Sequence, residues 1–142
     1  MKPSILAAFA EAAPYIPELR KLTGSVTSAI LMARLEYHFE TIRSPCFYKF
    51  LEPPETGHRD YRHGDSWTEE LAFSKEEFRT AFDKIGVRYN SKTQYDKAKS
   101  IGSEFGDKFY CSCYDRRSGL TSYYRNHKKV NALFSTFKRG VA

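Results

Sequence analysis

The sequence has few of the features that mark secreted, membrane-spanning or repetitive proteins. Its three cysteines are an odd number and provide no disulfide framework, and a reducing cytoplasm suits them better than an oxidising compartment. No apolar run approaches the roughly 18 residues that a membrane span requires. The chain has neither an internal repeat nor a low-complexity tract. We therefore expect one cytoplasmic domain that spans residues 1–142, with no membrane partner.

Signatures of catalysis and metal binding are also missing from the sequence. It contains no G-x-S-x-G, no P-loop and no H-E-x-x-H motif, and the "HRD" of 58–60 lacks the other kinase motifs. Zinc could be imagined on Cys46, on the "CSC" of 111–113 and on His58, His63 and His127. However, C-x-C is not the usual C-x₂₋₄-C spacing, and no second pair exists. We expect no enzyme, with no catalytic residues, no metal, no cofactor and no small-molecule substrate.

Acidic residues are scarce in the second part of the chain, so the net charge of +6 is unevenly spread. Residues 1–83 contain 10 Lys/Arg and 13 Asp/Glu, whereas residues 84–142 contain 13 Lys/Arg and 4 Asp/Glu. This asymmetry is typical of a protein that binds a polyanion on one side, and nucleic acid is the commonest polyanion. The alternative is a soluble protein whose basic side is simply solvated.

The first part of the chain predicts two helices and a strand. Pro17 at a first helical position and Gly24 at a stop position predict a short helix over 17–23, within an N-terminal extension of residues 1–24. Residues 25–42 have a wide apolar face at helical spacing and predict a buried helix. The aromatic segment 46–51 predicts a short strand.

A long polar loop follows this strand, at residues 52–65. Such a length is uncommon in a compact domain, which indicates that part of the loop is mobile or functional.

The segment "SWTEELAFSKEEFRTAF" (66–82) contains two helix-start signals only eight residues apart. The two Ser-x-x-Glu pairs fit the capping-box pattern: Ser66 with Glu69, and Ser74 with Glu77. They predict a brief helix over 67–72 and a second helix over 75–85 with one apolar face. Two helices that start separately and cross steeply are typical of a helix-turn-helix, here residues 66–86.

The rest of the chain predicts a basic segment, a hairpin and a closing helix. Residues 87–105 form a basic insertion with a helix from about 92 to 101, started by a Ser-x-x-Gln box. The β-rich segments around "RRSG" predict a hairpin over 108–126, and residues 128–138 have the spacing of a helix. We therefore expect a mainly α protein with a small antiparallel sheet, of the α+β class.

Three segments resemble the winged-helix domains of phage and plasmid replication proteins: "CFYKF", "SWTEELAFSKEEFRTAFDKIG" and "YCSCYDRRSGLTSYYRNHKKVNALF". In such domains a Phe-Tyr-Lys strand precedes a Trp-x-Glu-Glu-Leu helix, a Ser-capped recognition helix follows, and the wing ends in Tyr-Tyr-Arg. The resemblance covers residues 25–137 and implies a winged helix-turn-helix with extra N-terminal and C-terminal helices. It also implies double-stranded DNA binding in replication initiation or its control. The chain departs from the pattern at 52–65 and at 87–105.

Candidate DNA contacts lie on the predicted recognition helix, on the basic insertion and on the hairpin. Arg79 is the best candidate for a bidentate contact to guanine in the major groove. Arg116 and Arg117 at the hairpin tip suit phosphate or minor-groove contact. The acids Glu76 and Asp83 dilute the charge of the helix. The expected contacts are Lys75, Arg79, Thr80, Lys84, Arg88, Lys92, Lys97, Lys99, Arg116, Arg117 and Arg125.

Other interpretations remain open at this point. The same fold could serve a transcriptional regulator, or act as a protein-interaction module without DNA. Single-stranded nucleic acid could stack on the hairpin tyrosines, which are Tyr110, Tyr114, Tyr123 and Tyr124. Possible protein partners are a second copy of the chain or replication-complex proteins, and the apolar segment 4–16 could serve such an interface.

Overall fold

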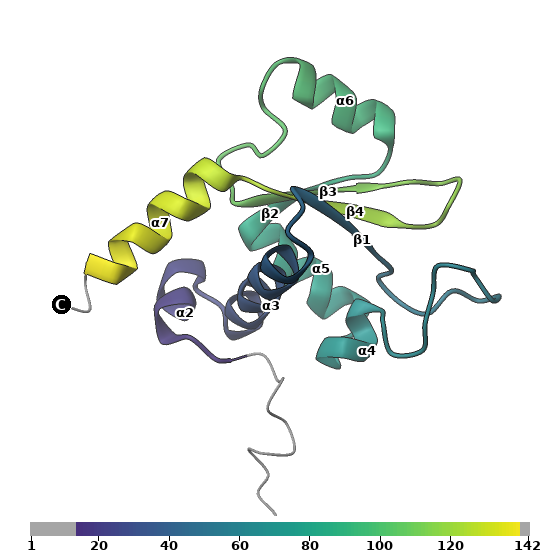
Figure 1. Cartoon of the computed structure of the whole chain (residues 1–142), viewed down its shortest axis with the longest axis horizontal. Coiled ribbons are helices and arrows are strands. Elements are labelled where there is room, and N and C mark those ends of the chain that lie inside the picture. Colours follow the sequence, from purple (N-terminus) through teal and green to yellow (C-terminus); the bar gives the residue numbers. More distant parts are fainter. Residues whose placement is uncertain (1–13, 140–142) are drawn as a thin grey trace, which may run out of the picture.

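The structure, a computed structural model, describes residues 14–139 and has an α+β fold in this range (Figure 1). Six helices and four strands follow one another in these residues. Their order is α2 (Pro17–Thr23), α3 (Val26–Ile42), β1 (Cys46–Lys49), α4 (Trp67–Leu71), α5 (Lys75–Ile85), β2 (Gly86–Tyr89), α6 (Lys92–Ser100), β3 (Tyr110–Tyr114), β4 (Thr121–Arg125) and α7 (His127–Arg139).

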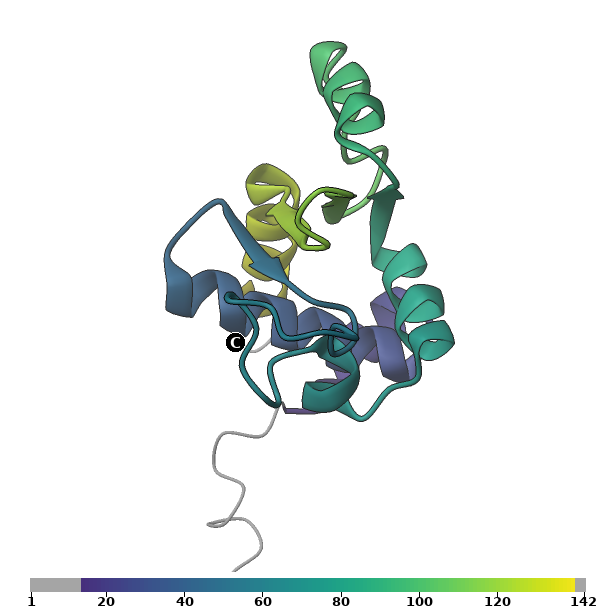
Figure 2. The ribbon, with the colours of Figure 1, turned by 90° about the vertical axis from the view of Figure 1, so that its right-hand side faces the viewer.

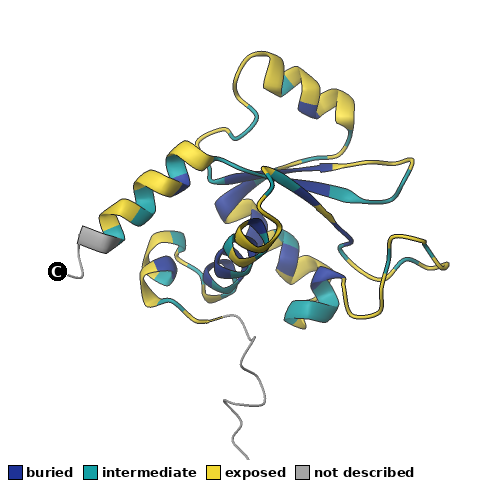
Figure 3. Ribbon diagram, in the orientation of Figure 1, coloured by how far each residue is buried: buried dark blue, intermediate teal, exposed yellow. Residues whose placement is uncertain are grey.

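Helices lie on both faces of a four-stranded sheet whose order is β1-β4-β3-β2 (Figure 1). Side chains of the inner face, Phe47, Tyr110 and Tyr123, are buried against the helices α3, α4 and α5. The outer face is covered by α6, where the ring of Tyr95 stacks on Tyr124 at a centroid distance of 4.8 Å. Burial is concentrated between the sheet and the helices α3 and α5, whereas α6 is largely exposed (Figure 3).

The sheet is mixed, so the prediction of an antiparallel sheet is wrong for one strand. β1 and β3 both run antiparallel to β4, but β2 pairs parallel with β3. Strand β2 begins at Gly86, the residue after α5 ends, and continues into the predicted basic insertion of 87–105. Gly86 permits this abrupt transition, because a Cβ there would lie 2.6 Å from the ring of Phe82 and 3.1 Å from the carbonyl oxygen of Tyr110.

Both predicted capping boxes are confirmed, and they start two separate helices. The Ser66 hydroxyl accepts from the Glu69 amide at 3.4 Å, and the Glu69 carboxylate accepts from the Ser66 amide at 3.2 Å. At α5 the corresponding distances are 3.0 Å and 2.9 Å. Between the helices, Ala72 adopts a left-handed conformation with φ of 57°, which turns the chain away from the axis of α4.

The other predicted elements are confirmed with small shifts of their ends. The helix predicted over 17–23 has these bounds, and that over 25–42 begins at Val26. The predicted strand ends at Lys49, and the closing helix begins at His127. Most of the apolar segment 4–16 lies outside the described residues. Among the residues described, no helix combines the length and the apolar character that crossing a membrane requires.

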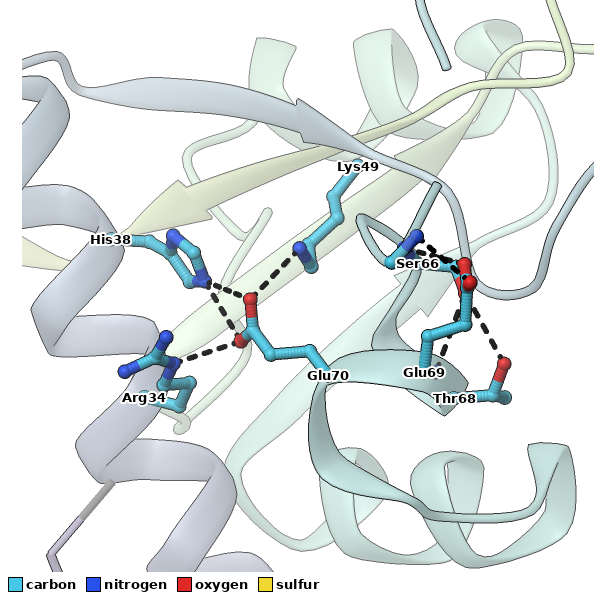
Figure 4. Close-up of polar contacts among 8 residues, drawn as sticks. Arg34, His38, Lys49, Ser66, Thr68, Glu69 and Glu70 are labelled. Carbon is cyan, nitrogen blue, oxygen red and sulfur yellow. Dashed lines mark hydrogen bonds and ion pairs between the residues drawn. The ribbon is translucent and has the colours of Figure 1, made fainter. Parts of the chain in front are cut away.

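A carboxylate on α4 holds three elements together through three basic side chains (Figure 4). The Glu70 carboxylate accepts from Arg34 Nε at 2.9 Å and from Lys49 Nζ at 3.1 Å, and it lies 2.9 Å from His38 Nε2. Arg34 and His38 belong to α3, and Lys49 belongs to β1. The cluster is mostly buried, with side-chain exposures of 9 to 17%. These contacts fix α4 against the helix and the strand that precede it.

The pKa of Glu70 reflects this surrounding positive charge. Burial alone would raise the pKa, but the hydrogen bond and charge of His38, with Lys49 and Arg34, outweigh burial and lower the pKa to about 2. The folded protein therefore keeps this carboxylate ionised at acidities where an exposed glutamate is protonated.

The preceding residue, Glu69, organises the long loop 52–65. Its carboxylate accepts from the Tyr61 hydroxyl at 2.7 Å and from the Gly64 amide at 2.9 Å. Hydrogen bonds from Ser66 and then from Tyr61 lower the pKa of Glu69 to about 2. Earlier in the loop, His58 Nε2 donates to the carbonyl oxygen of Ser118 at 2.9 Å. The loop has no helix or strand, yet it is tied both to the start of α4 and to the β3–β4 turn.

We predict that Glu70→Gln lowers the free energy of unfolding at pH 7 by about 3 kcal/mol, because it leaves clustered cations without their carboxylate. In the wild type, the stabilisation by Glu70 is complete above its unfolded pKa of 4.5 and is lost as the pH falls through the folded value of about 2. The difference between wild type and variant should therefore shrink as the pH falls over this window. Urea unfolding can be followed by the fluorescence of Trp67, the sole tryptophan.

Glu40→Gln, at an exposed position of α3, is the matched control and should change stability by less than about 0.5 kcal/mol. A constant difference between wild type and Glu70→Gln from pH 7 to pH 2 would contradict the ionised cluster.

Candidate nucleic-acid interface

Helix α5 presents the polar face that the sequence predicts. Its inner side buries Phe78, Ala81, Phe82 and Ile85. The opposite side carries four of the expected contacts. They are Lys75, Thr80 and Lys84, which are exposed, and Arg79, which is half-buried. Because both α5 and α4 have their own caps, this face is held at a fixed angle to the rest of the fold.

Carboxylates accompany the cations of this face. Lys75 Nζ lies 3.3 Å from Glu52, and Arg79 lies 3.4 Å from Glu76. Arg88 on β2 makes a bidentate pair with Asp83, at 2.7 Å and 2.9 Å. These pairs are largely exposed, and such pairs contribute only about 0–1 kcal/mol each. An anionic ligand such as a phosphate could therefore replace these carboxylates as the partner of the cations, with little loss of free energy from the broken pairs.

A groove of about 470 Å³ separates α5 from the β3–β4 turn. Lys75 and Arg79 line it from α5, Arg88 from β2, and Ser118 and Gly119 from the turn. Residues 50–55 and His58 also line it. The structure thus brings three of the expected contacts together around one depression.

The turn between β3 and β4 is organised by Asp115. Its carboxylate accepts from the Arg117 amide at 2.9 Å and from the Ser118 hydroxyl at 3.1 Å. The hydrogen bond from the Arg117 amide, followed by that from Ser118, lowers the pKa of Asp115. Arg116 and Arg117 are both exposed at the tip, as predicted from the hairpin pattern.

The cations of the basic insertion lie elsewhere. Lys92, Lys97 and Lys99 are exposed on α6, which packs on the outer face of the sheet. Figure 2 shows α6 at the top of the molecule, with β2 between it and α5. These three lysines therefore do not share the surface of α5, because the parallel pairing of β2 carries α6 into a different layer.

Arg125 does not fit its predicted role as a DNA contact. Its guanidinium donates to Glu36 on α3 at 2.9–3.0 Å and to Asn131 on α7 at 2.9 Å. The side chain is only 11% exposed. Tyr110 also donates to Glu36, at 2.6 Å. Arg125 therefore links β4 to α3 and α7 in the interior.

The hairpin tyrosines do not form an open stacking surface. Tyr110 and Tyr123 are buried in the core, and Tyr124 is covered by Tyr95 of α6. Tyr114 differs, because it is 41% exposed and borders the groove beside Arg88. The alternation in "YCSCY" indicates that Tyr110, Ser112 and Tyr114 share one face, but it does not reveal which tyrosine remains accessible.

The structure offers no metal site in the part of the chain that it describes. No group of three or more His, Cys, Asp or Glu side chains among these residues is arranged to hold an ion. Burial raises the pKa of Cys111 to about 12, so this thiol is in its neutral form at pH 7.

We predict that Arg125→Ala lowers the free energy of unfolding by about 3–5 kcal/mol, because it leaves the Glu36 carboxylate buried without its cation. Arg116→Ala, which removes the same charge from an exposed tip, should change stability by less than about 0.5 kcal/mol. Thermal unfolding by circular dichroism measures both. Equal stability of the two variants would contradict the interior role of Arg125.

Comparison with known proteins adds no assignment. No family model, curated protein or solved structure matches the chain. Function is therefore inferred from the positions of α5, the groove and the β3–β4 turn, together with their charges.

Proposed function

We propose that this chain is a winged-helix domain that binds double-stranded DNA. The observation that carries the proposal is the groove between α5 and the β3–β4 turn. It is bordered by Lys75, Arg79 and Arg88 and lies next to the turn that exposes Arg116 and Arg117. A helix face and a basic hairpin on either side of one depression are suited to a helix in the major groove with a hairpin on the adjacent backbone.

The order and pairing of the elements support the winged-helix assignment. A helix (α3), a strand (β1), two separately capped helices (α4 and α5) and a hairpin (β3 and β4) follow one another. The first strand, β1, pairs antiparallel with the last, β4, which in turn pairs antiparallel with β3. In this proposal α5 is the recognition helix, the β3–β4 hairpin is the wing, and β2 with α6 is an insertion between them.

Each side chain of the surface has a distinct part in the proposal. Arg79 faces base edges in the major groove, where a guanidinium can contact guanine through two hydrogen bonds. Lys75, Thr80 and Lys84 contact phosphates or neighbouring bases. Arg116 and Arg117 contact the DNA backbone or the minor groove. Arg88 contacts phosphate after it leaves Asp83, since the free pair is exposed and weak.

The biological setting of the proposal depends on the resemblance to winged-helix domains of phage and plasmid replication proteins. We propose replication initiation or its control in a mobile element. A transcriptional regulator would use the same helix and wing, so the two roles differ in the DNA site rather than in the surface.

A protein-interaction module is the second candidate, and one observation favours it. The polar face of α5 carries Lys75, Arg79 and Lys84 but also Glu76, Glu77 and Asp83, so its formal charge is balanced. A balanced face suits a protein partner. We favour DNA because Glu77 is used by the helix cap and because the arginine tip lies beside the groove.

We predict that the double variant Arg116→Ala/Arg117→Ala binds every duplex more weakly, because two phosphate contacts are lost. The slope of log K against log salt should fall in magnitude by about 2, roughly one unit for each contact. Arg79→Ala should instead change the preferred sequence, at a discrimination cost of about 1–3 kcal/mol for one base pair. Fluorescence anisotropy with random duplex at several salt concentrations and selection from random duplexes measure these two effects.

Lys97→Ala/Lys99→Ala is the matched control, because it removes two charges from α6 in another layer of the fold. It should leave the slope nearly unchanged. Two results would count against the proposed surface. One is a wild-type affinity for duplex that does not vary with salt, and the other is an equal loss of affinity in Arg116→Ala/Arg117→Ala and Lys97→Ala/Lys99→Ala. Failure of the wild type to bind both heparin and duplex at low salt would favour the protein-interaction module.

A further inference from the structure

The groove beside α5 combines charged side chains with an exposed aromatic ring, and contact with a paired duplex does not account for this combination. We propose that it holds an unpaired nucleotide of a strand that continues from the bound duplex. This inference rests on the proposed function, because a duplex on α5 and the wing would bring a strand end or a melted base pair to the mouth of the groove. The protein would then recognise a junction between double-stranded and single-stranded DNA.

The size of the groove fits a nucleotide. Its volume of about 470 Å³ lies within the range of about 300–1,000 Å³ that is common for small-molecule sites. A B-DNA duplex, whose major groove alone is about 12 Å wide, cannot enter such a space. Part of the groove therefore remains unfilled when a fully paired duplex lies across the outer edge.

The groove is lined by side chains of both charges. They are Lys75 and Arg79 of α5, Arg88 of β2, and Glu52 and Glu55 of the loop after β1. A nucleotide has groups that suit both kinds of side chain, an anionic phosphate and the amino groups of its base edges. Arg88, which the proposed function assigns to a phosphate, can bind the phosphate of this nucleotide, and carboxylates can accept from base amino groups. The Lys75–Glu52 pair, at 3.3 Å, would open as the nucleotide enters.

The lining of the groove includes an exposed aromatic ring. Tyr114 is 41% exposed, whereas Phe50, Phe78 and Tyr123, which also line the groove, are buried. Base–aromatic stacking tolerates any base, because each base has a π face. Asn90 and Thr121 add an amide and a hydroxyl group that can hydrogen-bond a base edge. Stacking on the outer face of the sheet is blocked by α6, so Tyr114, the exposed last residue of β3, is the ring available to a strand in the groove.

The inference can be tested with a labelled 20-base-pair duplex, blunt or extended at either the 3′ or the 5′ end by five unpaired thymidines. We expect one extended duplex to bind the wild type about fivefold more tightly than the blunt duplex, or better. Tyr114→Ala should abolish this gain while blunt affinity stays within about twofold. Tyr114→Phe keeps the ring and should keep the gain.

Tyr48→Ala is the matched control, since Tyr48 is 66% exposed on β1 outside the groove and should retain the gain. Thermal unfolding of each variant identifies any variant that fails to fold. The gain in affinity on extending the duplex, measured for Tyr114→Phe, then shows whether the aromatic ring is sufficient without the hydroxyl group. Equal binding of blunt and extended duplexes by the wild type, or a gain that survives in Tyr114→Ala, overturns the inference. Tight blunt binding without a gain leaves the proposed function standing, whereas binding of extended strands alone overturns the duplex proposal.

Discussion

The fold depends on a single carboxylate placed among three basic side chains. Glu70 joins α4 to Arg34 and His38 on α3 and to Lys49 on β1, elements that are 21 to 36 residues away in the chain. An isolated charge at this depth would be costly, but each of these groups is paired. Its neighbour Glu69 binds the loop 52–65. The position of α4 determines where the chain turns at Ala72, and so where α5 begins.

The proposed DNA surface follows from this scaffold and from weak, exposed ion pairs. In the free protein, Glu52, Glu76 and Asp83 occupy the cations of the groove, and phosphate would take their place. In the free protein these pairs offset the charges of Lys75, Arg79 and Arg88, whereas Arg116 and Arg117 stay exposed at the turn. The pair of Glu36 and Arg125, in contrast, is largely buried and links β4 to α3.

Local chemistry in the sequence predicts much of this fold, and distant pairing accounts for the rest. The capping boxes at Ser66 and Ser74 and the stop at Gly24 act within a few residues, so their patterns predict helix ends closely. Strand β2 has four residues, and its partner β3 begins 24 residues later, so its parallel pairing leaves little local signal. The burial of Arg125 and the covering of Tyr124 by α6 likewise depend on elements brought together only by the complete sheet.

Hydrogen exchange, measured by mass spectrometry on the protein with and without a random duplex at low salt, tests the proposed surface most directly. We expect slower exchange in residues 74–85 and 115–120 on addition of DNA, because backbone opening is suppressed where a ligand is bound. The exchange of α6, residues 92–100, should not change. Protection confined to α6 or α7, with none in α5 and the hairpin tip, would contradict the assignment of this face to DNA.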